Sequence, residues 1–252
     1  MTIVEMMLLF LAGVVTGMVN TIAGSGTIFS LGTMVFLGIP IEIANTTNRL
    51  GVLFQNIAGS LSYRKYDSLS HLRLPYAAAA ATFTGALLGA YFAANVSSGT
   101  FELLALVVIL ALIIQSVLDM RGTALTFSLH FRSDSTVAEV AVFFLIGLYG
   151  GFIQIGVGIL LLLGIRAFFQ LTWNESNYLK LLIVLIYTVP TTVYFAVVGM
   201  IRWEVGLFLA AGQIVGAYGA ARMFSLNEKL KAFIPYFVLG MLVLTALKIL
   251  FL

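Results

Sequence analysis

The chain interrupts its first apolar run at Asn20-Thr21-Ile22-Ala23-Gly24-Ser25-Gly26, and a later one at Gln154-Ile155-Gly156-Val157-Gly158. Each interruption is followed by an apolar segment of 13 residues, at 27–39 and at 157–169. At a helical rise of 1.5 Å per residue such a segment covers about 20 Å, whereas the hydrocarbon core of a bilayer is about 30 Å thick. The two stretches therefore predict broken or short helices beside Gly-x-Gly breaks.

The composition indicates a membrane protein. Of the 252 residues, 61% are apolar and 9% are charged, and the mean hydropathy is +1.09. Soluble proteins have about 45–50% apolar and about 25% charged residues. We therefore expect an all-α polytopic protein in a lipid bilayer, in a plasma or bacterial inner membrane, and exclude the soluble enzymes. The first apolar run has no Lys or Arg before it, so we expect it to be retained rather than cleaved as a signal peptide.

Residue types that are absent or rare exclude several kinds of chemistry. The chain has no cysteine, which excludes disulfides and thiolate metal sites. Its two histidines, His71 and His130, lie in polar stretches. We therefore expect no metal and no cofactor. The net charge of +3 is small, and in a membrane protein it reports loop orientation rather than nucleic-acid binding.

The apolar segments form two similar halves. The matched positions are Gly13 and Gly17 with Gly147 and Gly151, residues 44–48 with 176–180, and residues 85–91 with 212–218. The matches come in the same order, which predicts a first transmembrane repeat over 1–118, a connecting loop over 119–137 and a second repeat over 138–252. The expected segments are approximately 3–22, 27–39, 41–62, 75–96, 100–118, 138–155, 157–169, 174–198, 204–221 and 232–252.

An odd number of segments in each half predicts that the second repeat is inverted relative to the first. With the loop 63–74 in the cytoplasm, ten of the thirteen Lys and Arg residues lie on the cytoplasmic side, as the positive-inside rule requires. Both termini are then outside, and the 119–137 loop is cytoplasmic. The ten residues are Arg64, Lys65, Arg73, Arg121, Arg132, Arg166, Lys180, Arg222, Lys229 and Lys231.

The two breaks are candidate anion sites. Each precedes a short helix, whose first backbone N–H groups and positive dipole end would point into the break. Broken helices in transporters bind anionic substrates in this way. Glycine could instead serve only a tight turn or a close helix contact, but its recurrence in both halves favours a binding site. The candidate substrate-binding residues are Asn20, Gly24, Ser25, Gly26 and Thr27 in the first break, and Gln154, Gly156 and Gly158 in the second.

Two cations lie inside apolar segments. Arg49 is about 12 Å deep and Lys180 about 9 Å deep, from opposite faces. All ten carboxylates fall in loops or at segment ends, which suggests a small anion as the partner and argues against coupling through a buried carboxylate. Coupling through unwound backbone carbonyls stays open, and each cation could simply snorkel to its interface. The polar neighbours that we include as candidate binding residues are Asn45, Thr47, Asn48 and Asn177.

These glycines and small polar residues carry a family resemblance. The first half reads Gly13-x-x-x-Gly17-x-x-Asn20-x-x-x-Gly24-x-Gly26, then Gly38-Ile39-Pro40, Ala44, Thr47, Gly59 and Tyr63. With the weaker copy at Gly147, Gly151, Gly156 and Gly158, it resembles the sulfite exporter TauE/SafE family over essentially the whole chain. The sequence departs from the family pattern at Ala-Gly-Ser-Gly after the first segment and at Val157, the counterpart of Ser25. The resemblance implies a membrane transporter of sulfite, sulfonates or related sulfur-containing anions.

We therefore expect a transporter of a small anion that works by alternating access between the repeats, with export implied by the resemblance alone. An anion channel is the first alternative, and a membrane subunit that transports nothing is another. An intramembrane serine enzyme at Ser25 is disfavoured because neither histidine lies within a span to act as its base. The sequence leaves a homo-oligomer open.

Overall fold

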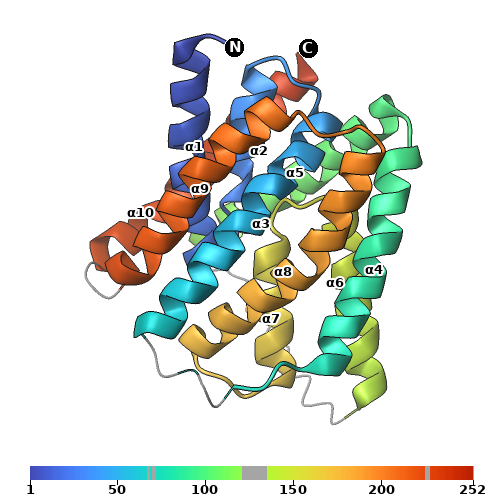
Figure 1. The fold of residues 1–252 in the computed structure, drawn as a ribbon, viewed down its shortest axis with the longest axis vertical. Coiled ribbons are helices and arrows are strands. Elements are labelled where there is room, and N and C mark those ends of the chain that lie inside the picture. Colours follow the sequence, from blue (N-terminus) through green and yellow to red (C-terminus); the bar gives the residue numbers. More distant parts are fainter. Residues whose placement is uncertain (67–68, 70–71, 121–134, 225–227, 252) are drawn as a thin grey trace.

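The computed structural model describes the chain except residues 67–68, 70–71, 121–134, 225–227 and 252. The described part is all-helical, with ten α-helices and no strand (Figure 1). Their bounds are α1 Ile3–Ile22, α2 Thr27–Phe36, α3 Ile41–Tyr66, α4 Tyr76–Asn95, α5 Ser98–Met120, α6 Thr136–Phe152, α7 Val157–Phe168, α8 Trp173–Val197, α9 Trp203–Phe224 and α10 Glu228–Leu250. The sequence prediction of an all-α polytopic fold with short helices after both breaks is confirmed.

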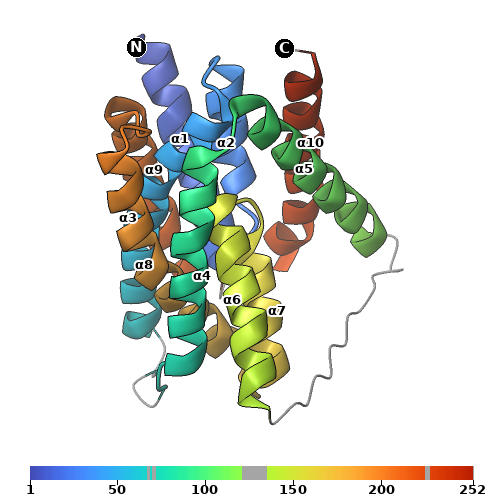
Figure 2. The ribbon, with the colours of Figure 1, turned by 90° about the vertical axis from the view of Figure 1, so that its right-hand side faces the viewer.

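The two repeats are inverted in space, as Figure 2 shows. From the end that holds both termini, α1 runs into the molecule and α2 returns to the same end. From the opposite end, α6 runs inward and α7 returns. The 10 residues of α2 and the 12 of α7 cover about 15 and 18 Å at 1.5 Å per residue, so neither short helix is long enough to cross a bilayer core by itself, and each pair forms a re-entrant hairpin whose tip lies inside the bundle.

Length and apolar composition identify the helices that could span a bilayer. Among the described residues, four helices are long and apolar enough to cross a membrane: α1, α4, α5 as far as Leu118, and α8. α5 presents Leu103, Val107 and Ile114 at 55–62% exposure, as expected of side chains that face lipid. The 26 residues of α3 are long enough to span but carry many polar side chains, and these are buried against other helices rather than lipid.

Glycines allow close helix contacts between the two repeats. A Cβ added at Gly151 of α6 would lie 2.6 Å from Ala86 Cα of α4, and one added at Gly17 of α1 would lie 2.8 Å from Gln213 Cα of α9. The backbones of α4 and α6, and of α1 and α9, therefore touch through small residues, as in other membrane helix pairs. Each contact joins a helix of one repeat to a helix of the other.

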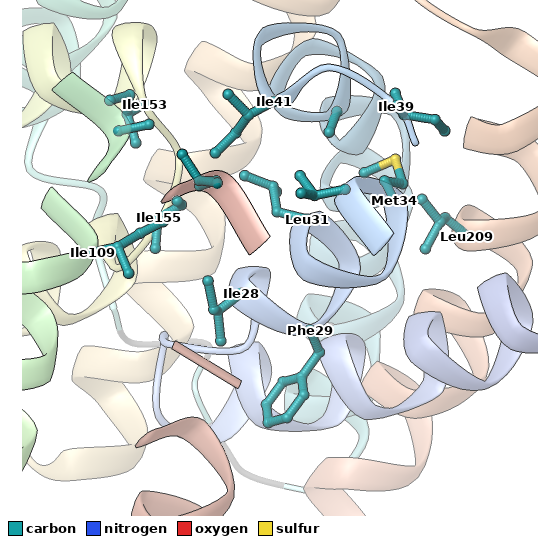
Figure 3. Packing of buried hydrophobic residues seen from close by; sticks show 14 of the residues in the cluster. Ile28, Phe29, Leu31, Met34, Ile39, Ile41, Ile109, Ile153, Ile155 and Leu209 are labelled. Carbon is teal, nitrogen blue, oxygen red and sulfur yellow. The ribbon is translucent and has the colours of Figure 1, made fainter. Parts of the chain in front are cut away.

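The short helix α2 packs against apolar residues of several other helices. Ile28, Leu31 and Met34 are fully buried, and Figure 3 shows them beside residues of other elements such as Ile109 of α5 and Leu209 of α9. This packing fixes the first break at the centre of the bundle. The proposed joint between the repeats falls mainly on residues 121–134, outside the described part, so the division of the chain there stays a prediction.

Candidate functional site

The tips of the two hairpins meet. A Cβ added at Gly158 would lie 2.6 Å from Gly24 Cα, and one added at Gly24 would lie 2.6 Å from the carbonyl carbon of Gly158. Gly24 and Gly156 have φ angles of +79° and +72°, which favour glycine because it has no Cβ. The sharp turns at these two positions reverse the chain and bring the two breaks, 134 residues apart in the sequence, into backbone contact.

A small polar cavity lies beside this contact. Its volume is about 20 Å³, room for a single water molecule. Both breaks and both long polar helices contribute to it, and there is no Asp or Glu among the described residues that line it. The lining residues are Asn20, Gly24, Thr27, Val52, Gln55, Asn56, Gln154, Val157, Gly158, Lys180 and Val184.

Lys180 is the charged residue of the cavity lining. It is buried on α8, and its Nζ donates to the backbone oxygens of Asn20 (2.9 Å) and Thr21 (3.3 Å) and to Asn177 Oδ1 (2.8 Å). An ammonium has three N–H donors, so all three are used. The two carbonyls belong to the last turn of α1, where a positive charge is favoured by the helix dipole. Lys180 therefore gives the cavity charge without a free N–H group.

Arg49 makes the equivalent contact in the other repeat. From α3, its guanidinium donates to the backbone oxygens of Gly150 (3.1 Å) and Gly151 in the last turn of α6, and to Thr191 Oγ1 (3.2 Å). It also lies over the ring of Phe195, 4.9 Å from the centroid. Arg49 is fully buried but is not among the residues that line the cavity. Neither cation snorkels to an interface; each binds the carbonyl end of a re-entrant helix.

The amide side chains of Asn20, in the last turn of α1, and Gln154, just after α6, have different roles. Asn20 Oδ1 accepts from the backbone N–H of Thr27 (3.1 Å), and so binds one of the free amides at the start of α2. Gln154 donates its backbone N–H to Asn45 Oδ1 (3.1 Å), and its Oε1 accepts from Asn48 Nδ2 (3.4 Å). The Nε2 group of Gln154 is buried and has no hydrogen-bond partner among the described residues. Gln154 lines the cavity, so this amide is a candidate donor to a ligand there, with the buried hydroxyl of Tyr187 as the neighbour that competes for it.

The structure places the remaining predicted residues around this centre. Ser25 and Gly156 line a larger cavity of about 220 Å³ on the other side of the breaks. Asn45 donates to the backbone oxygen of Phe152 (2.9 Å). Thr47 lies away from the cavity and accepts from the backbone N–H of Arg202 (3.1 Å). The larger cavity is lined by Ala23, Ser25, Ile28, Leu112, Gln115, Ser116, Ile155, Gly156, Ile159, Pro235, Val238 and Leu242.

Sequence reasoning missed several polar residues of the site. Gln55 and Asn56 line the small cavity, and Gln55 Oε1 accepts from Asn20 Nδ2 (3.4 Å). Ser30 and Gln213 were also missed, and both donate to Oδ1 of the predicted residue Asn48, from Ser30 Oγ (2.6 Å) and from Gln213 Nε2 (3.0 Å). A census of every amide inside an apolar segment would have found them, because polar side chains in a membrane are costly and usually functional.

Comparison with known proteins agrees with this architecture. The family described as "Sulfite exporter TauE/SafE" matches residues 9–249. The chain is 27% identical over 215 residues to "Probable membrane transporter protein ORF9" of Sinorhizobium sp, covering 85% of this chain and 81% of that protein. No solved structure gives a significant match. The chain therefore belongs to the sulfite exporter TauE/SafE family, and it is a multi-pass membrane transporter.

Proposed function

We propose that this transporter exports a small sulfur-containing anion, sulfite or an organosulfonate, by alternating access. The observation that carries the proposal is the cavity between the hairpin tips, where Lys180 and several donors converge without a carboxylate. Lys180 supplies the positive charge. The name of the family supports the sulfur-containing anion.

The hydrogen bonds to the anion come from the second break. Val157 and Gly158, in the first turn of α7, line the cavity, and the backbone N–H groups of a first turn have no partner within their helix. The positive end of the α7 dipole lies at the same place. Together with Nε2 of Gln154 they form a set of donors, which is the chemistry that an oxyanion requires.

The cavity is too small for the substrate in this conformation. A volume of 20 Å³ holds about one water molecule, and a sulfite ion has four heavy atoms. In the proposed mechanism the tips therefore separate to admit the substrate. The larger cavity lies between the second half of α5 and the first half of α10, and an apolar cavity of about 150 Å³ is known to hold a benzene molecule. It gives an organosulfonate a route to the breaks.

The charges at the two ends of the molecule support an orientation with both termini outside, and the direction of transport itself is proposed from the family name. Both termini lie at one end (Figure 2). Among the described residues outside the buried site, Arg64, Lys65 and Arg166 lie in the last turns of α3 and α7 at the opposite end, whereas Lys248 lies in the last turn of α10 at the end of the termini. The positive-inside rule then puts that end in the cytoplasm and both termini outside.

Ser25 fits a transporter better than an enzyme. There is no His, Asp, Glu or Lys among the described residues that line the cavity around it, and a serine nucleophile needs a base within reach. His71 and His130 both lie outside the described residues.

Efflux from proteoliposomes tests the function. Vesicles loaded with sulfite, sulfate, thiosulfate, sulfoacetate or acetate should show saturable, counterflow-stimulated efflux of the sulfite or sulfonate. Gln154→Leu should reduce this efflux because it removes the free donor, whereas Asn95→Leu, an exposed amide at the end of α4, should not. Flux that rises linearly with concentration would identify a channel, and no flux of any anion would refute transport.

A further inference from the structure

The carbonyl ends of both re-entrant helices are cation sites. In transporters with broken helices, half-helix C-termini and unwound carbonyls coordinate the driving ion, such as Na⁺. Here three oxygens from the end of α1 and from Asn177 surround one point at 2.8–3.3 Å, and that point is Nζ of Lys180. A nitrogen of the protein itself thus fills a cage that is chemically suited to a monovalent cation.

The corresponding group of oxygens at the end of α6 is also occupied by a positively charged side chain. Two carbonyls at the end of α6 and the hydroxyl of Thr191 bind the guanidinium of Arg49. In each case the cation comes from the long helix of the opposite repeat, α8 for α1 and α3 for α6. The arrangement therefore occurs twice, on two different sets of residues.

We propose that Lys180 and Arg49 are tethered substitutes for a dissociable coupling cation, so that anion flux through this protein requires no Na⁺ or K⁺. The inference rests on the proposed anion transport, since it concerns how that flux is driven. A tethered ammonium has the charge of Na⁺ and satisfies the same oxygens, but it cannot leave with the substrate. The carrier keeps its positive charge in every cycle and binds the anion without a co-transported metal ion.

Replacing the external and internal cations tests the wild-type protein directly. Sulfite efflux from proteoliposomes should stay the same, within about twofold, in Na⁺, K⁺ or choline salts at equal ionic strength, because the cage is already occupied. A loss of about tenfold or more in choline would overturn the proposal, since it would show that a dissociable metal ion is still needed.

Truncating the lysine should reopen the cage. Lys180→Ala removes the last four heavy atoms of the side chain, including the nitrogen, and leaves room for methylammonium or Na⁺ beside the Asn20, Thr21 and Asn177 oxygens. Lys180→Met removes the charge but fills the space, and Lys248→Ala removes a lysine from the last turn of α10. In choline salts, efflux through Lys180→Ala should fall about tenfold and recover with millimolar methylammonium, because charge-assisted hydrogen bonds are restored.

The unfolding temperature tests cation binding at the vacated site independently of anion transport. In detergent, methylammonium should raise the unfolding temperature of Lys180→Ala but not of Lys180→Met, Lys248→Ala or the wild type, because only a vacated cage gains a ligand. Arg49→Ala with methylguanidinium provides the same test on the second cage, and covers the case in which Lys180→Ala does not fold. Absence of stabilisation in every variant that folds would overturn the proposal. If wild-type vesicles show no anion flux but methylammonium still stabilises the truncated variants, the proposed function is wrong, whereas the assignment of a cation site to these oxygens stands.

Discussion

Gly158→Ala tests whether the contact between the hairpin tips closes the path through the membrane. The new Cβ would lie 2.6 Å from Gly24 Cα and 2.7 Å from the Gly24 backbone oxygen, whereas ordinary Cβ contacts begin at 3.4 Å. The tips must therefore separate by about 0.4 Å to reach the 3.0 Å limit of real Cβ contacts, and by about 0.8 Å to reach ordinary contact at 3.4 Å. Gly24 cannot easily change its backbone conformation to relieve this contact, because the chain reversal from α1 to α2 requires its φ of +79°.

The size of the effect follows from this overlap. Adding one methyl group to a closely packed contact costs about 1–3 kcal/mol. If the closed arrangement alone bears that cost, the equilibrium moves toward open arrangements by a factor of about 5–150. Gly164→Ala is the matched control on the same helix. Its Cβ would first meet the flexible end of Ile146 at 3.2 Å, and it gives a similar gain in helix propensity.

A cysteine in the small cavity measures the opening. The native chain has no cysteine, so Val184→Cys introduces one reporter in the cavity lining. Its reaction with a membrane-impermeant maleimide should be about 5–150 times faster in the Gly158→Ala background than in the Gly164→Ala background. Equal rates in the two backgrounds would show that the tip contact is ordinary packing and that the barrier lies elsewhere.

Three other substitutions address the charge, the packing and the larger cavity. Arg49→Lys should keep more anion flux than Arg49→Gln, because an ammonium can still bind the α6 carbonyls while the shorter amide cannot reach them; equal initial rates would contradict this. Gly151→Ala should destabilise the protein by about 1–2 kcal/mol through its overlap with α4, whereas Gly240→Ala, with nothing within 4 Å, should stabilise it, as thermal unfolding in detergent can show. Val238→Phe should block organosulfonate efflux by filling the larger cavity, and Val243→Phe, exposed on the same helix, should not; equal efflux from both would exclude this cavity as a route.

The sequence was sufficient to predict the helices because the bilayer imposes simple constraints. A span must be apolar and about 20 residues long, so the segments could be read directly, and the 13-residue segments stood out as too short. The repeat was readable because glycine contacts tolerate few substitutions: Gly13 and Gly17 recur as Gly147 and Gly151 in the same backbone contacts. These features depend on local sequence or on its repetition.

The partners of the buried cations could not be predicted in the same way. Lys180 binds carbonyls of residues 20 and 21, and Arg49 binds carbonyls of residues 150 and 151, in each case more than 100 positions away. Every residue has a backbone carbonyl, so the sequence does not indicate which carbonyl accepts a hydrogen bond from a side chain far away in the chain. The absence of a buried carboxylate suggested a transported anion as the partner of both cations. In the structure, backbone oxygens accept the hydrogen bonds of both cations.

That pairing explains how a centre built from helix ends can prefer an anion. Each hairpin brings one carbonyl end and one amide end to the middle of the membrane, so a bare pair of breaks would offer sites of both signs. Lys180 and Arg49 occupy the carbonyl ends of α1 and α6, which removes the places where a free cation could bind. The first turn of α7 keeps its amides toward the cavity, with Lys180 beside them. What remains for a ligand is a set of donors beside a positive charge, and this supports the proposed preference for an anion, because the protein closes the carbonyl ends with its own side chains and leaves amide donors for the ligand.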